Sequence, residues 1–323
     1  MIISRTPFRV SFAGGGSDLR AYYRHYGGAV LSVSIDKYVY LSMHPYFNGD
    51  KFLLKYSQHE LVDEVSQIQH RIIRQVFGEF GIRGVDFNSS ADVPAGTGLG
   101  SSSAFTAGLI NLCHAYLGRH VSREILAEQT CELEIEKLGE PIGKQDQYAC
   151  AIGGLNFIEF LDNERVRMER VHMLPEQLRL LEQNLLLFYV GNTRSASVIL
   201  TEQQQNMSES PQKIQSLHRM VELARTLKNE LQNNHPDALG EILHAGWMYK
   251  RELASQISNP TIDEFYETAR RAGATGGKLL GAGGGGFLLF YVPAAQQPAV
   301  RQALNGLYEM PFTFDFTGTS IIF

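Results

Sequence analysis

Three glycine-rich segments constrain this chain more than any other feature of its sequence. They are Arg5–Asp18, Pro94–Ala104 and Lys278–Phe287, and each contains at least three glycines. Glycine loses more backbone freedom on folding than any other residue, so a cluster of glycines needs a structural or functional reason. The usual reason is a backbone that must approach a ligand closely, and phosphate is a common ligand of such loops. Because the second segment runs into a helical pattern, it predicts a phosphate site at a helix N-terminus.

Composition excludes several classes of protein. Of the 323 residues, 44% are hydrophobic and 20% are charged, which is typical of a globular protein with one or two domains. The net charge of -5 argues against general binding to nucleic acids. The longest apolar run, 287–292, has the length of a strand and not of a membrane span, and the N-terminus lacks the apolar core of a signal peptide. We therefore expect a cytoplasmic protein whose cysteines are buried and reduced: Cys113, Cys131 and Cys150.

The pattern of strands and helices predicts an α+β fold in two halves. Strand patterns dominate the first 60 residues, and turn residues separate them. Helices are expected at 59–80, 101–116, 122–138, 212–233, 236–257 and 261–272, with Ser101–Ser103 as N-cap residues and 202–211 as a loop or helix break. Two strands at 155–173 and one at 185–190 lie near the middle of the chain. We place the boundary near residue 180, between an N-terminal domain, 1–180, and a C-terminal domain, 181–323.

Two common nucleotide-binding motifs are excluded. No segment matches the GxxxxGK[ST] pattern of a P-loop. Gly281, Gly283 and Gly286 match GxGxxG, but they lead into the strand pattern 287–292 instead of a helix. A dinucleotide site needs a strand, then the glycines, then a helix, so this match does not indicate one.

Taken together, the three segments resemble the motifs of the galactokinase, homoserine kinase, mevalonate kinase and phosphomevalonate kinase (GHMP) superfamily. Their order and spacing fit, the resemblance covers nearly the whole chain, and the run from Pro94 through Gly98-Leu-Gly-Ser-Ser102 is a specific signature of that superfamily. The resemblance implies two α+β domains with an active site between them. It also implies ATP as phosphoryl donor, with the middle segment as the phosphate loop.

The resemblance assigns residues to the nucleotide and to a magnesium ion. The implied ATP-binding residues are Pro94, Gly96, Gly98, Leu99, Gly100, Ser101, Ser102, Ser103, Gly283 and Gly284. Ser102 is the implied hydroxyl ligand of Mg²⁺, although the same serines would also serve as helix caps. On a helix, Glu132 and Glu136 share one face and Glu134 points away from it, so the first two suit a solvated surface. The resemblance implies Glu134 as the carboxylate ligand.

Asp146 and Arg9 are the implied catalytic residues. Asp146 lies in the sequence Gly143-Lys-Gln-Asp-Gln147, which matches the galactokinase branch, and would accept the proton of the acceptor hydroxyl. Arg9, in the first segment, would keep that carboxylate ionised and stabilise the transferred charge. Without the resemblance, Arg9 could equally be an outward strand residue and Asp146 a turn residue.

The first segment differs from galactokinase and suggests another sugar. Gly14-Gly-Gly-Ser-Asp18, together with Gly191–Ser197 and Leu253–Pro260, most resembles the D-glycero-D-manno-heptose 7-phosphate kinase branch. The implied reaction is phosphorylation of the anomeric hydroxyl to give the 1,7-bisphosphate for nucleotide-activated heptose. The implied substrate-binding residues are Asp18, Gly15, Gly16 and Ser17, with Lys144 and Arg194 as the expected partners of the acceptor phosphate.

Two alternatives remain open from the sequence. A kinase for an unphosphorylated sugar, such as L-fucose or D-galactose, would share the fold and the catalytic residues but would not need the extra cations. A non-catalytic member would bind ATP or sugar as a regulator. The sequence predicts a small-molecule partner, with no nucleic acid or membrane partner, and leaves the oligomeric state open.

Overall fold

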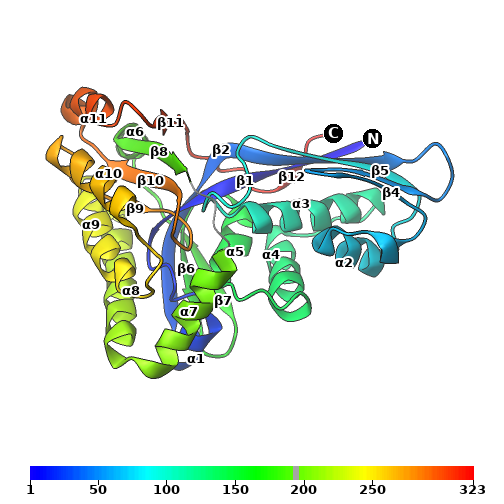
Figure 1. Ribbon diagram of the computed structural model, residues 1–323, viewed down its shortest axis with the longest axis horizontal. Helices are drawn as coiled ribbons and strands as arrows, with labels where there is room; N and C mark the ends of the chain where they lie inside the picture. Colours follow the sequence, from blue (N-terminus) through cyan, green and yellow to red (C-terminus); the bar gives the residue numbers. More distant parts are fainter. Residues whose placement is uncertain (192–195) are drawn as a thin grey trace.

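Two β-sheets organise the chain, and their strands run mainly antiparallel (Figure 1). The structure is a computed structural model that describes residues 1–191 and 196–323. The first sheet has the order β12-β1-β2-β5-β3-β4, with β6 and β7 added beside β2. Its strands are β1 (Ile2–Ala13), β2 (Gly28–Pro45), β3 (Phe52–Lys55), β4 (His59–Val62), β5 (Val85–Ala91), β6 (Leu155–Phe160), β7 (Val166–Arg170) and β12 (Ser320–Ile321). The second sheet has the order β11-β8-β10-β9, from β8 (Leu185–Gly191), β9 (Gly276–Leu279), β10 (Gly286–Tyr291) and β11 (Tyr308–Glu309).

Strand β2 connects the two wings of the first sheet. Its first part pairs with β6 from Gly28 to Val33, and its second part pairs with β5 from Val39 to Pro45. The first part is buried throughout, whereas buried and partly exposed residues alternate after Val39. This change of pattern is the one expected of a strand that is covered on both faces at one end and on one face at the other.

The helices of the first half pack beneath the first sheet in Figure 1. They are α1 (Arg20–Tyr26), α2 (Arg71–Phe80), α3 (Ser101–Tyr116), α4 (Arg123–Cys131) and α5 (Gln145–Ile152), with a π-helix over Glu132–Lys137. The second half contributes α6 (Pro175–Gln183), α7 (Ala196–Glu209), α8 (Pro211–Gln232), α9 (Ala238–Arg251), α10 (Pro260–Arg271) and α11 (Gln297–Ala303). No helix in the described part of the chain is long and apolar enough to cross a membrane. All three cysteines are buried and free, and burial raises the pKa of each thiol.

The expected helix over 59–80 is wrong in its first half. Residues His59–Val62 form β4, an edge strand that pairs with β3, and only Arg71–Phe80 is α-helical. Leu61 is exposed on this edge, while Ile73, Val76 and Phe77 are buried on the helix. The apolar residues that suggested one helix therefore belong to two elements, and hairpin pairing with the preceding strand β3 makes the first of them a strand.

Other local expectations also needed correction. The π-helix interrupts the single helix expected over 122–138, and α1, α5, α6 and β9 were not expected at all. The stretch 202–211 is mostly helical, because α7 continues to Glu209 and the break comes at Ser210, just before Pro211 starts α8. Proline is favoured in the first turn of a helix but cannot continue the preceding one, which explains the position of the break.

The end of the chain returns to the first sheet. Strand β12 pairs with β1 through Ser4 and Ile321, and an isolated bridge joins Ile35 to Phe314. The two sheets lie on either side of the boundary interpreted near residue 180, but these last residues cross it. The C-terminal segment therefore ties the two halves together.

The second and third glycine-rich segments touch each other between the halves. A Cβ atom on Gly281 would lie 2.4 Å from the Cα of Gly98, and one on Gly98 would lie 2.6 Å from the carbonyl oxygen of Leu280. Both glycines also have positive φ angles, 86° for Gly98 and 72° for Gly281. Only glycine allows two backbones to approach this closely in this conformation.

We predict that Gly281→Ala destabilises the protein more than Gly118→Ala. Gly118 has a similar positive φ of 67° but no atom within 4 Å of an added Cβ, so it isolates the cost of the backbone conformation. That cost is about 1 kcal/mol, and the clash at Gly281 should add about 2 kcal/mol. Chemical denaturation of both variants measures the difference, and equal losses would contradict the close contact.

Candidate active site

A cavity of about 910 Å³ lies where the three glycine-rich segments meet. The first segment contributes Gly15 and Gly16, the second the residues from Pro94 to Ser103 except Thr97 and Leu99, and the third Gly281, Gly283 and Gly285. Helices α5, α7 and α9 complete the lining. Residues more than 250 positions apart in the sequence therefore form one concave site, as ligand sites between domains do.

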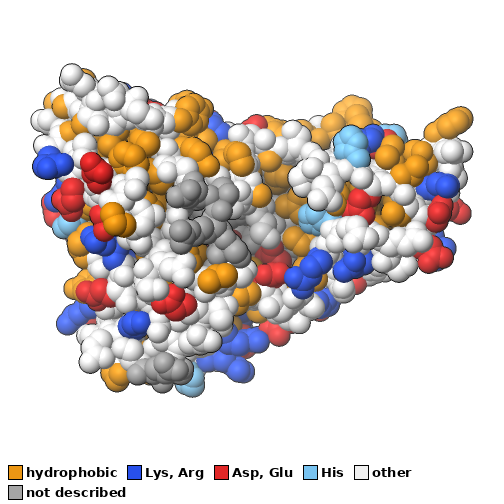
Figure 2. Space-filling model, in the orientation of Figure 1, with side chains coloured by type: hydrophobic (Ala, Val, Ile, Leu, Met, Phe, Trp, Pro, Cys, Tyr) orange, Lys and Arg blue, Asp and Glu red, His pale blue; other side chains and the backbone are white. Residues whose placement is uncertain are grey.

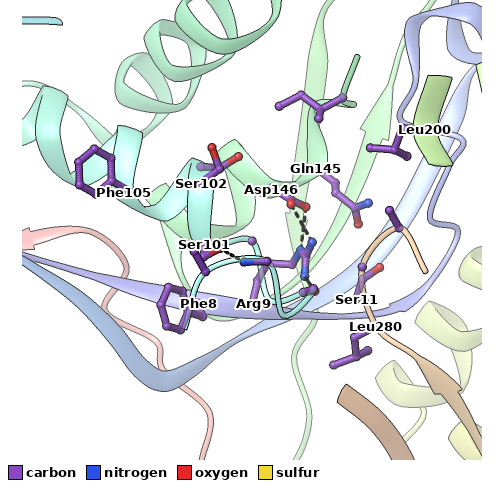
Figure 3. A pocket seen from close by; sticks show the side chains of 18 of the residues that line it. Phe8, Arg9, Ser11, Ser101, Ser102, Phe105, Gln145, Asp146, Leu200 and Leu280 are labelled. Carbon is purple, nitrogen blue, oxygen red and sulfur yellow. Dashed lines mark hydrogen bonds and ion pairs between the residues drawn. The ribbon is translucent and has the colours of Figure 1, made fainter. Parts of the chain in front are cut away.

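Arg9 and Asp146 face each other in the middle of this cavity (Figure 3). The guanidinium Nε and Nη2 of Arg9 donate to the two carboxylate oxygens of Asp146, each over 2.7 Å. Burial acts to lower the pKa of Arg9, but the neighbouring carboxylate outweighs it, and the net effect is a raised pKa. The pair is therefore a two-pronged, charge-assisted contact with fixed geometry.

Strand β1 and the second glycine segment hold Arg9 in place. Its Nη1 donates to the carbonyl oxygen of Gly98 over 2.6 Å, and its backbone N–H donates to that of Leu99 over 3.0 Å. Gly100 follows with a Cβ position only 3.2 Å from the Cγ of Arg9, so this glycine makes room for the side chain. Arg9 thereby links the second glycine segment to Asp146.

Helix α3 begins directly after this loop and points its N-terminus at the cavity. Its N-cap is Gly100, with no side-chain cap, so the expected capping by serines is wrong. The first N–H groups of a helix have no acceptor within the helix, and here they lie beside Ser101–Ser103, which all line the cavity. The hydroxyls of Ser102 and Ser103 are directed elsewhere, toward a carboxylate.

That carboxylate belongs to Glu134, which is almost fully buried. It accepts hydrogen bonds from Ser102 at 2.9 Å, Ser103 at 2.7 Å and Thr106 at 3.0 Å, and from Nε2 of Gln147 at 2.8 Å. Burial raises its pKa, although these donors act against the shift. A second cavity, of about 220 Å³, is also lined by Ser102 and Glu134. This hydroxyl and carboxylate are the hard oxygen donors that a divalent cation prefers.

Glu134 lies on the π-helix and points inward. A π-turn widens the helix locally, and such turns are often found at functional sites. The neighbouring acidic residues lie outside, where Glu132 pairs with Lys137 and Glu136 with Arg20. The structure therefore separates one acidic side chain from two solvated ones, in the arrangement expected from helical spacing.

Asp18 is at the end of the first glycine segment and lies close to Arg9 and Asp146. Its Oδ1 accepts from the backbone N–H of Gly16 at 2.9 Å, and its Oδ2 from that of Gln145 at 3.3 Å. Burial raises the pKa of Asp18, and the charge of Asp146 raises it further. Backbone donors thus hold the carboxylate of Asp18, and Asp18 is part of the cavity lining.

Three polar atoms around Asp18 have no hydrogen-bond partner within the described residues. They are Oγ of Ser11, Oε1 of Gln145 and Nε2 of Gln203, and all three residues line the cavity. Buried polar groups are rarely left unpaired without a reason. Together with Asp18, they form a polar wing suited to a ligand rich in hydroxyl groups.

The opposite wing is aromatic and apolar. It is lined by Phe8, Val39, Tyr56, His70, Ile72, Val93 and Phe105. Figure 3 shows Phe8 and Phe105 on one side of Arg9, and Ser11, Gln145 and Leu200 on the other. A flat apolar group such as a purine base suits the first wing, whereas a polar ligand suits the second.

Several residues expected at the site do not line the cavity. The hydroxyl of Ser17 donates to the carbonyls of Gly14 and Ala29, so it braces the loop instead of facing a ligand. Leu99 is fully buried, and Gly284 donates its N–H to Ile257. Lys144 pairs with Glu164 over 2.7 Å, which occupies its charge. Arg194 lies outside the described residues.

Two lysines that the sequence interpretation missed do line the cavity. Lys250 is on α9 and Lys278 on β9, and both are nearly buried. A signal was present for each, since Lys250 falls on the apolar face of its helix with Leu243 and Trp247, and Lys278 precedes two leucines. A lysine at a core position is unusual enough to indicate a function.

We predict that Lys278→Met stabilises the ligand-free protein. Burial, and then the charge of Arg9, lower the pKa of Lys278 from 10.5 to about 7. Between these values the unfolded chain binds more protons, so the free energy of unfolding of the wild type rises with pH. The variant should therefore gain about 1–3 kcal/mol below pH 7, and less as the pH rises toward 10.

Chemical denaturation at pH 6.5 and pH 9 measures this gain, with the exposed Lys51→Met as the matched control. Lys51 pairs with Asp63 at the surface, so its removal should change stability little at either pH. A Lys278→Met variant that is less stable than the wild type at pH 6.5 would contradict the prediction.

Comparison with known proteins supports the family that the three glycine-rich segments resemble. The models of the GHMP kinases N terminal domain and the GHMP kinases C terminal match residues 64–154 and 227–309, together just over half of the chain. D-glycero-alpha-D-manno-heptose 7-phosphate kinase of Campylobacter jejuni is 29% identical over 98% of this chain and 96% of its own. Galactokinase of Pyrococcus furiosus is 26% identical over 97% and 95%.

Solved structures agree with this relationship. A D-glycero-D-manno-heptose 1-phosphate kinase from Bacteroides thetaiotaomicron superimposes with a TM-score of 0.81 at 25% identity, over 99% of this chain and 98% of that one. A putative sugar kinase from Campylobacter jejuni superimposes with a TM-score of 0.77 at 27% identity, over 99% and 97%. The similarity thus extends over both halves and over all three glycine-rich segments.

Proposed function

The chain belongs to the GHMP kinases and is an ATP-dependent phosphotransferase, and we propose that it phosphorylates the anomeric hydroxyl of D-glycero-D-manno-heptose 7-phosphate. Its relatives support the coarser statement that it is a sugar kinase of the GHMP type. The observation that carries the proposal is the position of Arg9 and Asp146, between a helix N-terminus and a polar wing with unpaired groups. Because the chain is an enzyme, the alternative of a non-catalytic regulator is set aside.

ATP would lie along the second glycine segment. The free N–H groups at the start of α3 and the positive end of its dipole suit the β- and γ-phosphates. The aromatic wing that contains Tyr56, His70 and Phe105 would take the base. In this orientation the γ-phosphate points toward Arg9 and Asp146, which lie where the loop meets the polar wing.

Asp146 would receive the proton when the acceptor hydroxyl attacks the γ-phosphorus. The oxygen–phosphorus bond to the acceptor forms while the bond to the bridging β–γ oxygen breaks, and ADP leaves with that electron pair. Arg9 holds both carboxylate oxygens, which fixes the direction from which Asp146 approaches the hydroxyl. Its positive charge also stabilises the charge that develops on the transferred group.

A magnesium ion is the metal that this donor set fits best. Ser102 and Glu134 would hold it, and it would neutralise charge on the nucleotide phosphates. The fit rests on the buried carboxylate of Glu134, whose hydrogen-bond donors among the described residues are all neutral, and on the adjoining cavity that Ser102 and Glu134 both line. A bound cation would compensate the charge that burial penalises.

We predict that Glu134→Gln raises the concentration of Mg²⁺ needed for half-maximal ATP consumption by about 10- to 100-fold. The amide keeps the size of the side chain but removes the charge that would attract the ion. Glu132→Gln is the matched control, since Glu132 is exposed on the same π-helix and should leave the Mg²⁺ titration unchanged. Equal Mg²⁺ titrations for the two variants would refute the assignment.

The acceptor would bind in the polar wing. Asp18 can accept hydrogen bonds from two sugar hydroxyls, and the unpaired Ser11, Gln145 and Gln203 supply further partners. Gly16 makes room for Gln203 in this wing, since a Cβ on Gly16 would lie 2.4 Å from Nε2 of Gln203. The relative from Campylobacter jejuni is named for a heptose 7-phosphate and the one from Bacteroides thetaiotaomicron for a heptose 1-phosphate, so the position of the acceptor phosphate needs a direct test.

Phosphorus NMR tests the acceptor directly. We expect a new anomeric phosphate signal when the enzyme, Mg²⁺ and ATP are mixed with D-glycero-D-manno-heptose 7-phosphate. Parallel reactions contain heptose 1-phosphate, L-fucose or D-galactose, which should react at least tenfold more slowly. Turnover of a neutral sugar at a similar rate would contradict the proposed acceptor, while Asp146→Asn should lower product formation by about 10²- to 10⁴-fold.

A further inference from the structure

Two buried lysines meet near the end of the first glycine segment. Nζ of Lys250 donates to the carbonyl oxygens of Leu279 at 3.0 Å and Gly281 at 2.5 Å. Nζ of Lys278 donates to that of Phe12 over 3.3 Å. The side chains come from α9 and β9, and both line the cavity described above. Their ammonium groups are therefore held by backbone oxygens at the wall of the site.

Neither lysine has a carboxylate partner among the described residues. The charges that act on Lys250 are those of Lys278 and Arg9, and the charge that acts on Lys278 is that of Arg9. Burial is the main cause of the lowered pKa of both lysines, and the like charges lower it further. Arg9 is paired with Asp146, but the two lysines have no such partner, and buried amino groups without an opposing charge destabilise a protein unless an anion joins them.

A purely structural role explains only part of this arrangement. Lys250 joins the carbonyls of Leu279 and Gly281, and so supports the turn into the third glycine segment. Lys278 makes one hydrogen bond, and that bond is long, so a neutral side chain would suit its position better. Keeping a charge there is reasonable only if a ligand uses it.

The position of the pair favours the acceptor over the nucleotide. Phe12, which Lys278 contacts, follows Ser11 on β1 and comes just before the glycines at 14–16. Leu253, near the end of α9, lines the same cavity as Lys250. The phosphates of ATP already have the N-terminus of α3 and Ser102. Lys278 therefore lies beside the strand that leads to Asp18, and Lys250 lies close enough to Lys278 for the two charges to interact.

We propose that Lys250 and Lys278 form an anion subsite that holds the phosphate group already present on the sugar acceptor. The inference rests on the proposed function and names the residues that make the enzyme select a phosphorylated sugar. It replaces Lys144, whose charge is paired with Glu164. A neutral sugar would leave the two lysines without an opposing charge in the complex, so it should bind more weakly.

Isothermal calorimetry measures this subsite without turnover. The enzyme, saturated with Mg²⁺ and a non-hydrolysable ATP analogue, is titrated with D-mannose 6-phosphate, with D-mannose and with inorganic phosphate. We expect Lys250→Met and Lys278→Met to weaken binding of D-mannose 6-phosphate by about 10- to 100-fold, the value of one lost charge-assisted hydrogen bond. Lys278→Gln, which keeps a donor for Phe12 but loses the charge, should show the same loss. The exposed Lys51→Met is the matched control.

Steady-state kinetics then identify which phosphate the lysines serve. The variants should raise KM for heptose 7-phosphate and leave KM for ATP close to that of the wild type. A rise in KM for ATP, or the same loss of kcat with phosphorylated and neutral acceptors, would assign the lysines to the nucleotide and overturn the proposal. The proposal would also be overturned if Lys144→Met, and not the Lys250 and Lys278 variants, weakened sugar phosphate binding.

The two proposals fail in different ways. If the wild type does not phosphorylate heptose 7-phosphate, the proposed function is wrong, but loss of D-mannose 6-phosphate binding in the lysine variants still supports the subsite. If the wild type does phosphorylate it and the lysine variants bind D-mannose 6-phosphate as the wild type does, the subsite is wrong and the function stands. Thermal unfolding of each variant confirms that it is folded before either result is used.

Discussion

Arg9 is the point at which the parts of the active site are joined. Arg9 lies on β1 in the first glycine segment, and its side chain contacts Asp146 on α5 and the carbonyl oxygen of Gly98 in the second glycine segment. A planar guanidinium group can satisfy both partners at once because its donors have a fixed geometry. The arrangement of loop, strand and helix around the cavity therefore depends on this one buried side chain. Lysine at this position would keep the charge but could not make all three contacts.

Buried charges at the site cost stability and make catalysis possible. Glu134, Asp18, Lys250 and Lys278 are all nearly buried, and burial is the first cause of the pKa shift in each. Their charges are of both signs, but they are not paired directly with one another in the described structure. Each would instead be compensated by a ligand: a cation for Glu134, sugar hydroxyls for Asp18 and phosphate for the lysines. The protein should therefore be more stable with its substrates bound than without them.

The close contact of Gly98 with Gly281 decides how the two halves meet. The phosphate loop belongs to the first half, and the third glycine segment to the second. The C-terminal strand also links the halves, because it returns to the first sheet, where Ile321 pairs with Ser4. Acidic and basic side chains are interspersed on the face of the molecule shown in Figure 2.

The sequence by itself determined the parts of the site that depend on local patterns. The glycine spacing placed the second glycine segment at the start of α3, where it lines the cavity, and Arg9 meets Asp146 there. Tertiary structure decided the rest. Lys278 lies 266 residues from its partner Phe12, and Lys144 is taken out of the cavity by Glu164, so neither environment could be derived from neighbouring residues. The edge strand His59–Val62 depends instead on a contact close in the sequence, its hairpin pairing with β3. Backbone conformation near glycine is set locally by sterics, whereas the burial and pairing of a charge are set by whichever distant residues surround it.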